Sequence, residues 1–246
     1  MTQLYDRIGV DYRQRRRPDP RLAEQIRSRL PDRGTVVNLG AGTGSYEPTD
    51  LRVVAVEPSW TMIAQRSDGS APVVRATAEA VPFAAGSFTA ALAILTIHHW
   101  QRRSDAFAEI RRVAADRVVV VTWDPAHPGF WLTRDYFPEI LDVDRAIFPP
   151  LAELEQAFGR VSVHPWLVPR HCADGFLGAY WDRPEAYLDA GVRRGMSTFA
   201  KIDVEPGLAR LRADLASGAW QRRNAELAER SSADLGYRIV VAELGR

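Results

Sequence analysis

Apolar runs separated by polar and glycine-containing segments fill residues 35–123 and predict a series of strands. The runs cover Thr35–Leu39, Arg52–Glu57, Val73–Ala76, Phe88–Leu95 and Arg117–Trp123. Several of them are apolar at consecutive positions, which is typical of strands that are buried on both faces of a parallel sheet.

Helical spacing appears between and before these runs. It predicts helices from about Pro20 to Leu30 and over Ser104–Val113, where Ser104 is a candidate N-cap. The twelve residues from Gly40 to Leu51 are too few for a full crossover helix, so we expect a loop or a single turn there.

After Trp123, prolines and aromatic residues interrupt the pattern. A helix over Leu151–Phe158, a strand over Val161–Val168, a helical insert over about 174–230 and a closing strand over Tyr237–Leu244 are then predicted. We expect a doubly wound, Rossmann-like α/β fold with a mostly parallel seven-stranded sheet and an antiparallel last strand. The insert between the last two strands would form a lid over the carboxyl ends of the sheet. The chain is predicted to be one domain, 1–246, with a lead-in at 1–34, a cofactor-binding core at 35–125 and the lid at 174–230.

A glycine loop follows the first strand, and an acid ends the second. Gly40, Gly42 and Gly44 form a G-x-G-x-G sequence, and Glu57 closes the apolar run that begins at Arg52. Glycines let the backbone approach a ligand, and a carboxylate can accept hydrogen bonds from both hydroxyls of a ribose. The pair predicts a nucleoside site. A P-loop is excluded because no Lys-Ser/Thr pair follows the glycines.

The charge and cysteine content of the chain indicate which classes of partner are not expected. The net charge of +1 gives no reason to expect nucleic acid or an anionic membrane. Cys172 is the single cysteine, so we expect neither an intramolecular disulfide nor a thiolate metal site. One histidine in the loop of His171, Cys172 and Asp174 is poor evidence for another kind of metal site, so no metal is predicted. The basic run at Arg13 and Arg15–Arg17 lacks interleaved aromatic residues and is interpreted as a solvated face or the substrate side. The charged N-terminal sequence and the short apolar run Ala90–Leu95 favour a cytoplasmic protein.

Four ordered motifs resemble those of the class I S-adenosylmethionine-dependent methyltransferases, in the subgroup with a type 11 methyltransferase domain. They are the glycine loop, Glu57–Met62, Ala76–Phe83 and Ser87–Trp100. The resemblance implies S-adenosyl-L-methionine as cofactor, with the acid on the ribose, the methionine beside adenine and Thr77 and Ala78 at the adenine edge. The residues that it assigns to the cofactor are Asn38, Gly40, Ala41, Gly42, Gly44, Glu57, Pro58, Met62, Thr77, Ala78, Glu79, Leu95 and Tyr5.

Three positions depart from the family pattern. Asn38 replaces an acid that helps to hold the methionine amino group, Thr77 replaces an adenine-binding Asp, and Thr89 replaces the Asp of the fourth motif. An asparagine still accepts a hydrogen bond but adds no charge.

Some candidate catalytic residues come directly after the fourth strand, and others lie in the lead-in. His98 or His99 could take a proton from a hydroxyl or amine acceptor, and Tyr12, like Tyr5, resembles family aromatics that close over the methionine end. The alternatives are that the histidines cap a helix or pack inside and that the tyrosines only pack the lead-in on the sheet. His127 and His171 are further candidates, and Trp123, Phe130, Phe176, Tyr180 and Trp181 are candidates for an acceptor pocket.

We therefore predict an enzyme that transfers the methyl group of S-adenosylmethionine to a small-molecule acceptor. One alternative is a protein that binds the cofactor without methyl transfer, as a cyclase, an elimination enzyme or a regulatory partner. A nicotinamide-dependent oxidoreductase is disfavoured, because Ser45 stands where its third glycine is needed and no Tyr-x-x-x-Lys pair is found. The acceptor atom and the oligomeric state stay open.

Overall fold

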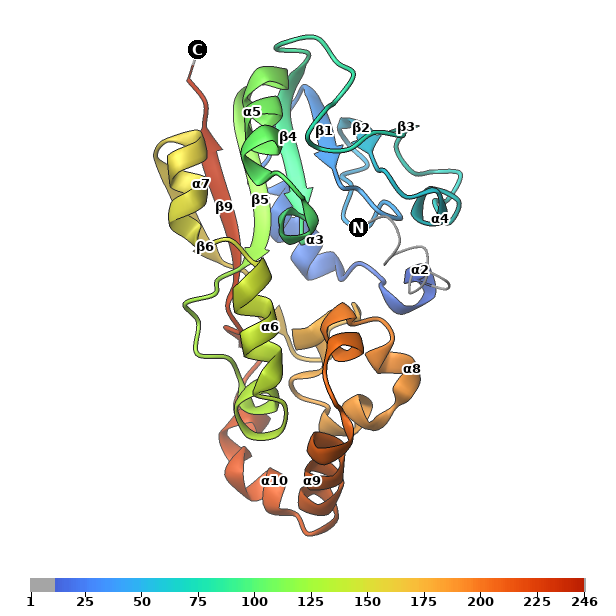
Figure 1. Ribbon diagram of the computed structural model, residues 1–246, viewed down its shortest axis with the longest axis vertical. Coiled ribbons are helices and arrows are strands. Elements are labelled where there is room, and N and C mark those ends of the chain that lie inside the picture. Colours follow the sequence, from blue (N-terminus) through green and yellow to red (C-terminus); the bar gives the residue numbers. More distant parts are fainter. Residues whose placement is uncertain (1–11, 246) are drawn as a thin grey trace.

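A seven-stranded sheet forms the centre of the computed structural model, which describes residues 12–245 (Figure 1). Its order is β3-β2-β1-β4-β5-β9-β6, and β9 runs antiparallel to both β5 and β6. The other pairings are parallel, so the predicted fold class is confirmed. The strands are β1 (Thr35–Leu39), β2 (Arg52–Val56), β3 (Val73–Val74), β4 (Phe88–Ile94), β5 (Ala114–Trp123), β6 (Val161–Pro165) and β9 (Tyr237–Glu243).

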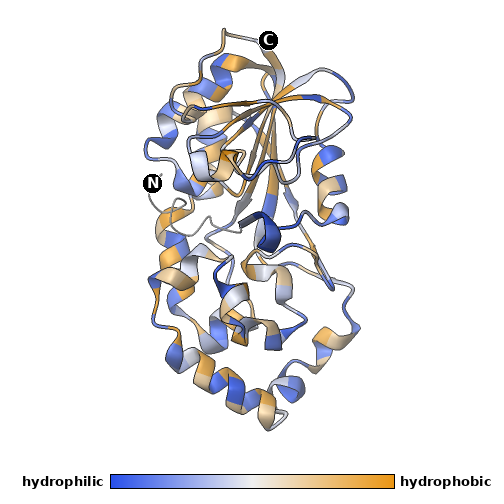
Figure 2. Ribbon diagram, turned by 90° about the vertical axis from the view of Figure 1, so that its right-hand side faces the viewer, coloured by the Kyte–Doolittle hydropathy of each residue, from blue (hydrophilic) through white to orange (hydrophobic). Residues whose placement is uncertain are grey.

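Successive residues of the central strands bury opposite faces of the sheet. Val36 of β1 belongs to one apolar cluster and Val37 to the other, and both are at most 1% exposed. Complete burial of such a side chain stabilises the fold by about 1.5–3 kcal/mol. Figure 2 shows apolar residues along the strands and mixed apolar and polar residues on the surrounding helices. The continuous apolar runs in the sequence thus reflect a sheet that is covered on both sides.

Helices cover the two faces and the lower end of the sheet (Figure 1). Leu22 and Ile26 of α3 pack in the cluster of Val36, whereas Phe107 of α5 and Leu154 of α7 pack in the cluster of Val37. The bounds of these helices and their neighbours are α2 (Tyr12–Arg15), α3 (Pro20–Arg27), α4 (Trp60–Ile63), α5 (Arg103–Val113), α6 (Glu139–Ile147) and α7 (Leu151–Phe158).

A helical segment between β7 (Val168–Pro169) and β8 (Ser232–Ala233) lies with α6 below the carboxyl ends of the parallel strands (Figure 1). β7 and β8 pair with each other in a separate two-stranded sheet. The segment contains η3 (Leu177–Tyr180), η4 (Pro184–Leu188), α8 (Ala190–Arg193), η5 (Ser197–Lys201), α9 (Glu205–Ala216), α10 (Ala219–Arg223) and η6 (Ala225–Glu229).

Several predicted boundaries are wrong, and three of these errors have a clear physical reason. The other differences include β5, which begins at Ala114 instead of Arg117, and β3, which ends at Val74 instead of Ala76. The strand expected over Val161–Val168 ends at Pro165, which has no N–H to continue a ladder, and the chain then enters β7. The first helix ends at Arg27, and the residues from Ser28 to Leu30 form tighter turns before Pro31. The third error concerns Ser104, which lies inside α5.

A tertiary contact lies at the start of α5. The N-cap residue is Arg102, which makes no side-chain capping bond. Instead, Glu79 Oε1 accepts hydrogen bonds from the N–H groups of Gln101 (2.9 Å) and Arg102 (3.4 Å). A carboxylate from another loop therefore binds the backbone just before the helix, which begins at Arg103, two residues before the start that an N-cap at Ser104 implies.

Candidate functional site

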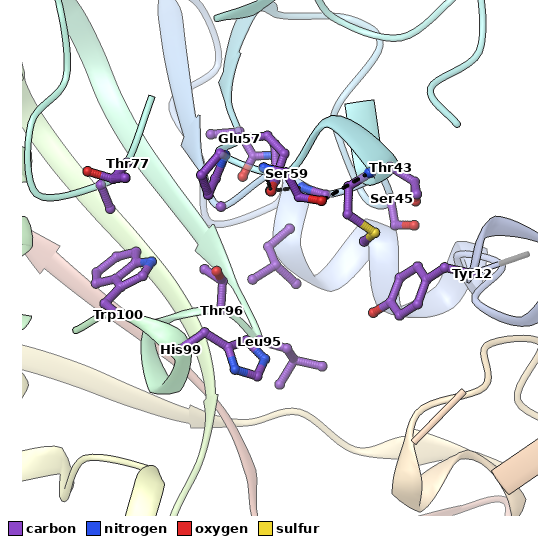
Figure 3. Close-up of a pocket in the computed structure, with 18 of the residues that line it drawn as sticks. Tyr12, Thr43, Ser45, Glu57, Ser59, Thr77, Leu95, Thr96, His99 and Trp100 are labelled. Atoms are coloured by element: carbon purple, nitrogen blue, oxygen red, sulfur yellow. Dashed lines mark hydrogen bonds between the residues drawn. The ribbon is translucent and has the colours of Figure 1, made fainter. Parts of the chain in front are cut away.

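The carboxyl ends of β1, β2 and β4 surround a cavity of about 360 Å³ (Figure 3). β1 lies between β2 and β4, so successive strands of the chain pair on opposite sides of it. Such a reversal of strand order opens a crevice at the strand ends, where doubly wound folds bind their ligands. Residues 40–51, which link β1 to β2, contain no helix, as the short connection predicts.

The glycine loop has a backbone that other residues would adopt only with strain. Gly40 and Gly42 have φ angles of 64° and 54°. A Cβ at Gly40 would lie 2.0 Å from Thr96 Oγ1, whereas one at Gly42 would lie 3.2 Å from the flexible Met62 Cε. Gly40 is thus required for packing of the loop against the end of β4, and Gly42 brings bare backbone to the cavity wall.

Glu57 connects this loop to the end of β2. Its two oxygens accept hydrogen bonds from Gly42 N and Ser59 N, both at 2.8 Å. Burial raises the pKa of the Glu57 carboxyl, and the two N–H bonds oppose that rise. The carboxylate lines the cavity and keeps acceptor lone pairs for two further donors, as a ribose with adjacent hydroxyls would supply.

Asn38 is held by a buried ion pair. Its Nδ2 donates to Glu47 Oε1 (3.1 Å), and Glu47 pairs with Arg66 at 2.7 Å, with both side chains at most 7% exposed. Arg66 also donates to Gly42 O (3.2 Å). Because a carboxylate only accepts, it fixes the Asn38 amide with Nδ2 toward Glu47. Oδ1 is then buried on the cavity wall without a partner among residues 12–245.

The remaining wall combines apolar surface with a few polar atoms. Thr43 Oγ1 is buried and has no partner in the described part of the chain. Ser59 caps α4, and its Oγ accepts from Met62 N (3.4 Å), which places the buried Met62 beside the glycine loop. Thr77 and Trp100 lie at one end of the cavity in Figure 3, and Tyr12 lies at the other.

Most residues assigned to the site from the sequence line this cavity. They are Tyr12, Asn38, Gly40, Ala41, Gly42, Glu57, Pro58, Met62, Thr77, Ala78, Glu79, Leu95 and His99. Gly44 lines a separate open groove with Arg66, and His98 lines a second cavity. Tyr5 lies outside the described residues. Their roles in cofactor binding and catalysis stay predictions.

Sequence reasoning missed several lining residues. They are Arg16, Thr43, Ser45, Tyr46, Ser59, Ile94, Thr96, Trp100, Gln101 and Arg102. Thr43 and Ser45 alternate with the loop glycines, so their position within the motif was a usable signal. Arg16 belongs to the basic run interpreted above as a solvated face or the substrate side, an interpretation that gave it no role of its own. Tyr46 carries no such signal, because only tertiary packing brings it to the wall.

A second cavity of about 90 Å³ adjoins the first and shares Tyr12, Arg16, Leu95 and His99 with it. Three of the five aromatic residues predicted for an acceptor pocket line it, namely Trp123, Phe130 and Phe176. Tyr180 and Trp181 do not contribute to its lining. Leu95, at the shared wall, has a φ angle of 48°, which costs a non-glycine residue about 1–3 kcal/mol.

His98 and His99 are in contact at the boundary of the two cavities. Their ring centroids are 3.8 Å apart with the rings tilted by 47°, whereas Phe148 stacks on His98 at 3.9 Å and 23°. Burial lowers the pKa of His98 well below its ordinary value and that of His99 to about 3. Both imidazoles are therefore neutral near pH 7 and suited to accepting hydrogen bonds. Neither caps a helix through its side chain in residues 12–245.

Tyr12 and Arg16 are connected to the distant loop at Asp174. Arg16 pairs with Asp174 at 2.8 Å and donates to Tyr12 Oη at 2.9 Å, and Tyr46 Oη donates to the second oxygen of Asp174 at 2.7 Å. Asp174 is 1% exposed and Arg16 is 14% exposed. The lead-in, the residue after the glycine loop and the segment below the sheet thus meet at one buried carboxylate.

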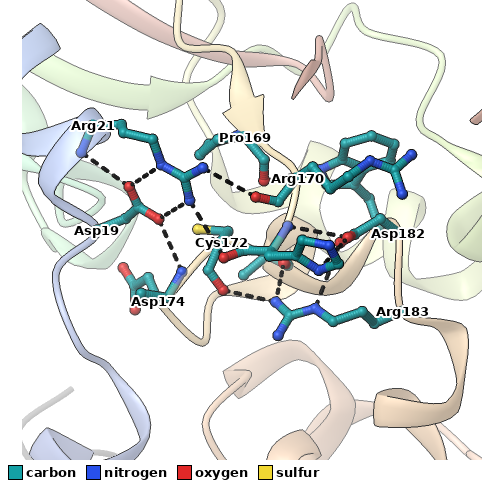
Figure 4. Close-up of polar contacts among 12 residues, drawn as sticks. Asp19, Arg21, Pro169, Arg170, Cys172, Asp174, Asp182 and Arg183 are labelled. Atoms are coloured by element: carbon teal, nitrogen blue, oxygen red, sulfur yellow. Dashed lines mark hydrogen bonds and ion pairs between the residues drawn. The ribbon is translucent and has the colours of Figure 1, made fainter. Parts of the chain in front are cut away.

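A neighbouring contact secures the same junction (Figure 4). Asp19, the N-cap of α3, binds Arg21 at 2.7 Å and accepts from Ala173 N at 2.9 Å. These bonds hold the pKa of the Asp19 carboxyl at about 2, against the effect of burial. Cys172 lies beside them, buried, with a thiol pKa raised to about 12 by that burial.

The other histidine candidates lie elsewhere. His171 is exposed and its Nδ1 lies 3.1 Å from Asp182, while His127 lies 3.9 Å from Asp234. Within residues 12–245, no group of three His, Cys, Asp or Glu side chains is arranged to hold a metal ion. None of the described helices has the length and apolarity needed to cross a membrane.

Known structures show which proteins the chain resembles. A protein of Anabaena variabilis ATCC 29413, assigned as a methyltransferase of an antibiotic biosynthesis pathway, is 35% identical, with a TM-score of 0.85 over 93% of this chain and 99% of that one. Phosphoethanolamine N-methyltransferase 2 of Haemonchus contortus, in complex with S-adenosyl-L-methionine, is 14% identical over 92% of this chain and 53% of that one, with a TM-score of 0.55. No curated protein matches the sequence significantly.

A further structural neighbour is a 4+2 cyclase, 16% identical over 92% of this chain and 80% of that one, with a TM-score of 0.54. At these identities the cyclase and the Haemonchus enzyme show the fold alone. A family model described as a methyltransferase domain matches residues 37–121, which span the glycine loop, Glu57 and β4. Together with the 35% identity over nearly the whole Anabaena chain, this match places the protein in the methyltransferase domain family, as an S-adenosylmethionine-dependent methyltransferase.

Proposed function

We propose that the first cavity binds S-adenosylmethionine and that the methyl group passes toward the second cavity, to a small-molecule acceptor. The observation that carries the proposal is the combination of Glu57 with buried, unpartnered polar atoms on Asn38 and Thr43. Buried polar atoms without partners are costly in a native protein, so they indicate a ligand that completes their hydrogen bonds. The cofactor supplies an activated methyl group when it is bound.

Each part of the wall suits one part of the cofactor. Glu57 would accept hydrogen bonds from the two ribose hydroxyls, and Thr77, Ala78 and Trp100 would face the adenine. Tyr12, which lies opposite Trp100 in Figure 3, would be at the methionine end, and the buried, unpartnered Oδ1 of Asn38 would face the methionine. An asparagine oxygen can accept a hydrogen bond from the methionine ammonium group, so Asn38 can make the contact for which the family pattern has an acid.

At the end of the first cavity that faces the acceptor, the protein would align the acceptor with the methyl group and exclude water. Leu95 and His99 separate the two cavities, and Tyr12 and Arg16 border both. Holding an acceptor against a bound methyl donor lowers the barrier by supplying orientation in advance. The assignment of the Anabaena relative to an antibiotic biosynthesis pathway supports a small-molecule acceptor.

Cofactor binding without methyl transfer is the alternative. The fold that the chain shares with a 4+2 cyclase is compatible with it, but the likeness to a methyltransferase over nearly the whole chain favours transfer.

Calorimetry with S-adenosylhomocysteine tests the cofactor site. We expect binding to the wild type and at least about a tenfold loss of affinity in Glu57→Ala, since hydrogen bonds to a charged group contribute about 1.5–3 kcal/mol. Glu155→Ala, on an exposed position of α7, is the control. Unchanged affinity in Glu57→Ala contradicts the site. Methyl-labelled cofactor incubated with small-molecule extracts tests transfer, and an absence of label in any product favours the alternative.

A further inference from the structure

The second cavity contains two polar groups that the cofactor site does not use. One is Nδ1 of His98, which is buried and has no hydrogen-bond partner in the described part of the chain. The other is the carboxyl group of Asp144, on α6, which is 7% exposed. A molecule bound in the cavity could satisfy both groups. Nδ1 of His98 is destabilising without a partner, and a hydroxyl group can serve it in either tautomer, whereas the Asp144 carboxyl can accept further hydrogen bonds.

Asp144 has little compensation from the protein. In residues 12–245 its carboxyl group receives one hydrogen bond, from Thr198 Oγ1 at 2.8 Å, and no Lys, Arg or His side chain lies within ion-pairing distance. Arg16 borders the same cavity, but its charge is matched by Asp174. The charge of Lys201 acts on Asp144 from beyond ion-pairing distance. The cavity therefore has an acidic group without an ion-pair partner among residues 12–245, which favours a cation over an anion.

The rest of the lining is suited to a flat ring. Trp123, Phe130, Phe148 and Phe176 contribute aromatic surface, and the Trp123 and Phe148 rings meet at 69° with centroids 5.7 Å apart. Aromatic side chains pack against planar groups with favourable stacked and edge geometries.

The size of the cavity limits the molecule that it can hold. Its volume is about 90 Å³, and it adjoins the first cavity, so there is room for no more than one ring.

We propose that the second cavity is the acceptor site and that it takes a single-ring compound with an ammonium group bound by Asp144 and a hydroxyl group bound by His98. This inference rests on the proposed function, because it places the acceptor beside the cofactor cavity. Asp144 is then a residue that determines specificity, and the hydroxyl group lies at the end nearer to His99 and the shared wall.

Three probes that share a phenol and differ at the other end test the proposal. Tyramine carries an ammonium group, 4-(2-hydroxyethyl)phenol an alcohol, and 3-(4-hydroxyphenyl)propionate a carboxylate. Their affinities are measured by calorimetry at pH 7.5 with the enzyme saturated with S-adenosylhomocysteine. We expect tyramine to bind about tenfold more tightly than the alcohol, and the carboxylate to bind more weakly than both.

The variant Asp144→Asn keeps an acceptor for Thr198 and removes the charge. We expect it to lose the preference for tyramine while its affinity for the alcohol changes by less than about threefold. Asp142→Asn, an exposed position on the same helix, is the matched control and should behave as the wild type.

Several results overturn the proposal. They are a carboxylate that binds as tightly as tyramine, a preference that survives in Asp144→Asn, or no binding of any of the three probes. Binding of S-adenosylhomocysteine is measured first in the same samples. If it depends on Glu57 while the probes show no preference, the acceptor class is wrong and the cofactor site stands. If it fails, the proposed function fails as well.

Discussion

Substitution of Gly40 by alanine should destabilise the protein far more than the same substitution two residues later. At Gly40 the new Cβ would lie 2.0 Å from Thr96 Oγ1 and 2.9 Å from Thr96 Cβ, at a φ of 64°. The left-handed backbone costs alanine about 1–2 kcal/mol, and the forced displacement adds about 1–3 kcal/mol. We therefore expect Gly40→Ala to lower the free energy of unfolding by about 2–5 kcal/mol.

Gly42→Ala is the matched comparison, because it imposes a similar backbone cost without a rigid neighbour. Its φ is 54°, and the nearest atom is the flexible end of Met62, at 3.2 Å. The expected loss is about 1–2 kcal/mol. Urea unfolding followed by tryptophan fluorescence measures both values.

A double-mutant cycle separates the steric contact from the backbone cost. Thr96→Ala removes the Oγ1 atom that the new Cβ approaches most closely, so it should recover part of the stability lost in Gly40→Ala. Equal losses in the two glycine variants, or the absence of coupling between positions 40 and 96, would refute the steric reasoning.

The remaining predictions concern the polar groups around the two cavities. Asn38→Leu should weaken S-adenosylhomocysteine binding about tenfold in calorimetry, because Oδ1 is lost, and an unchanged affinity would exclude that contact. Asp174→Asn should lower the free energy of unfolding by about 3–5 kcal/mol, since it leaves Arg16 without a counter-charge. Asp50→Asn, at the exposed pair with Arg27, should change the free energy of unfolding little. Equal effects of the two variants in urea unfolding would contradict the role of burial. Burial raises the pKa of the Asp144 carboxyl from 3.8 to about 6, so the folded protein keeps this proton up to a higher pH than the unfolded chain does. The free energy of unfolding therefore falls as pH rises from about 4 to 6. Relative to Asp144→Asn, the wild type should therefore lose about 2 kcal/mol of unfolding free energy between pH 4 and pH 7, and a pH-independent difference would show that this carboxyl group is not buried as described.

Local patterns in the sequence were sufficient for the sheet and for much of the first cavity. The continuous apolar runs predicted the parallel strands, because both faces of such a strand are buried. Gly40, Gly42 and Glu57 were found because a glycine loop and a terminal acid on adjacent parallel strands meet at the same edge of the sheet. The predicted N-cap at Ser104 is wrong, because α5 begins at Arg103, next to backbone N–H groups that Glu79 binds from another loop.

The sequence by itself determined the order of the elements and the residues at the ends of β1 and β2, since these depend on periodicity and on backbone conformation close to each residue. Only the tertiary structure decided which distant side chains meet. Arg16, Tyr46 and Asp174 converge on one buried ion pair, and Asp144 reaches the cavity of His98 from another helix. The physical reason is that burial and pairing of charges are set by packing between segments far apart in the chain, and no local pattern encodes them.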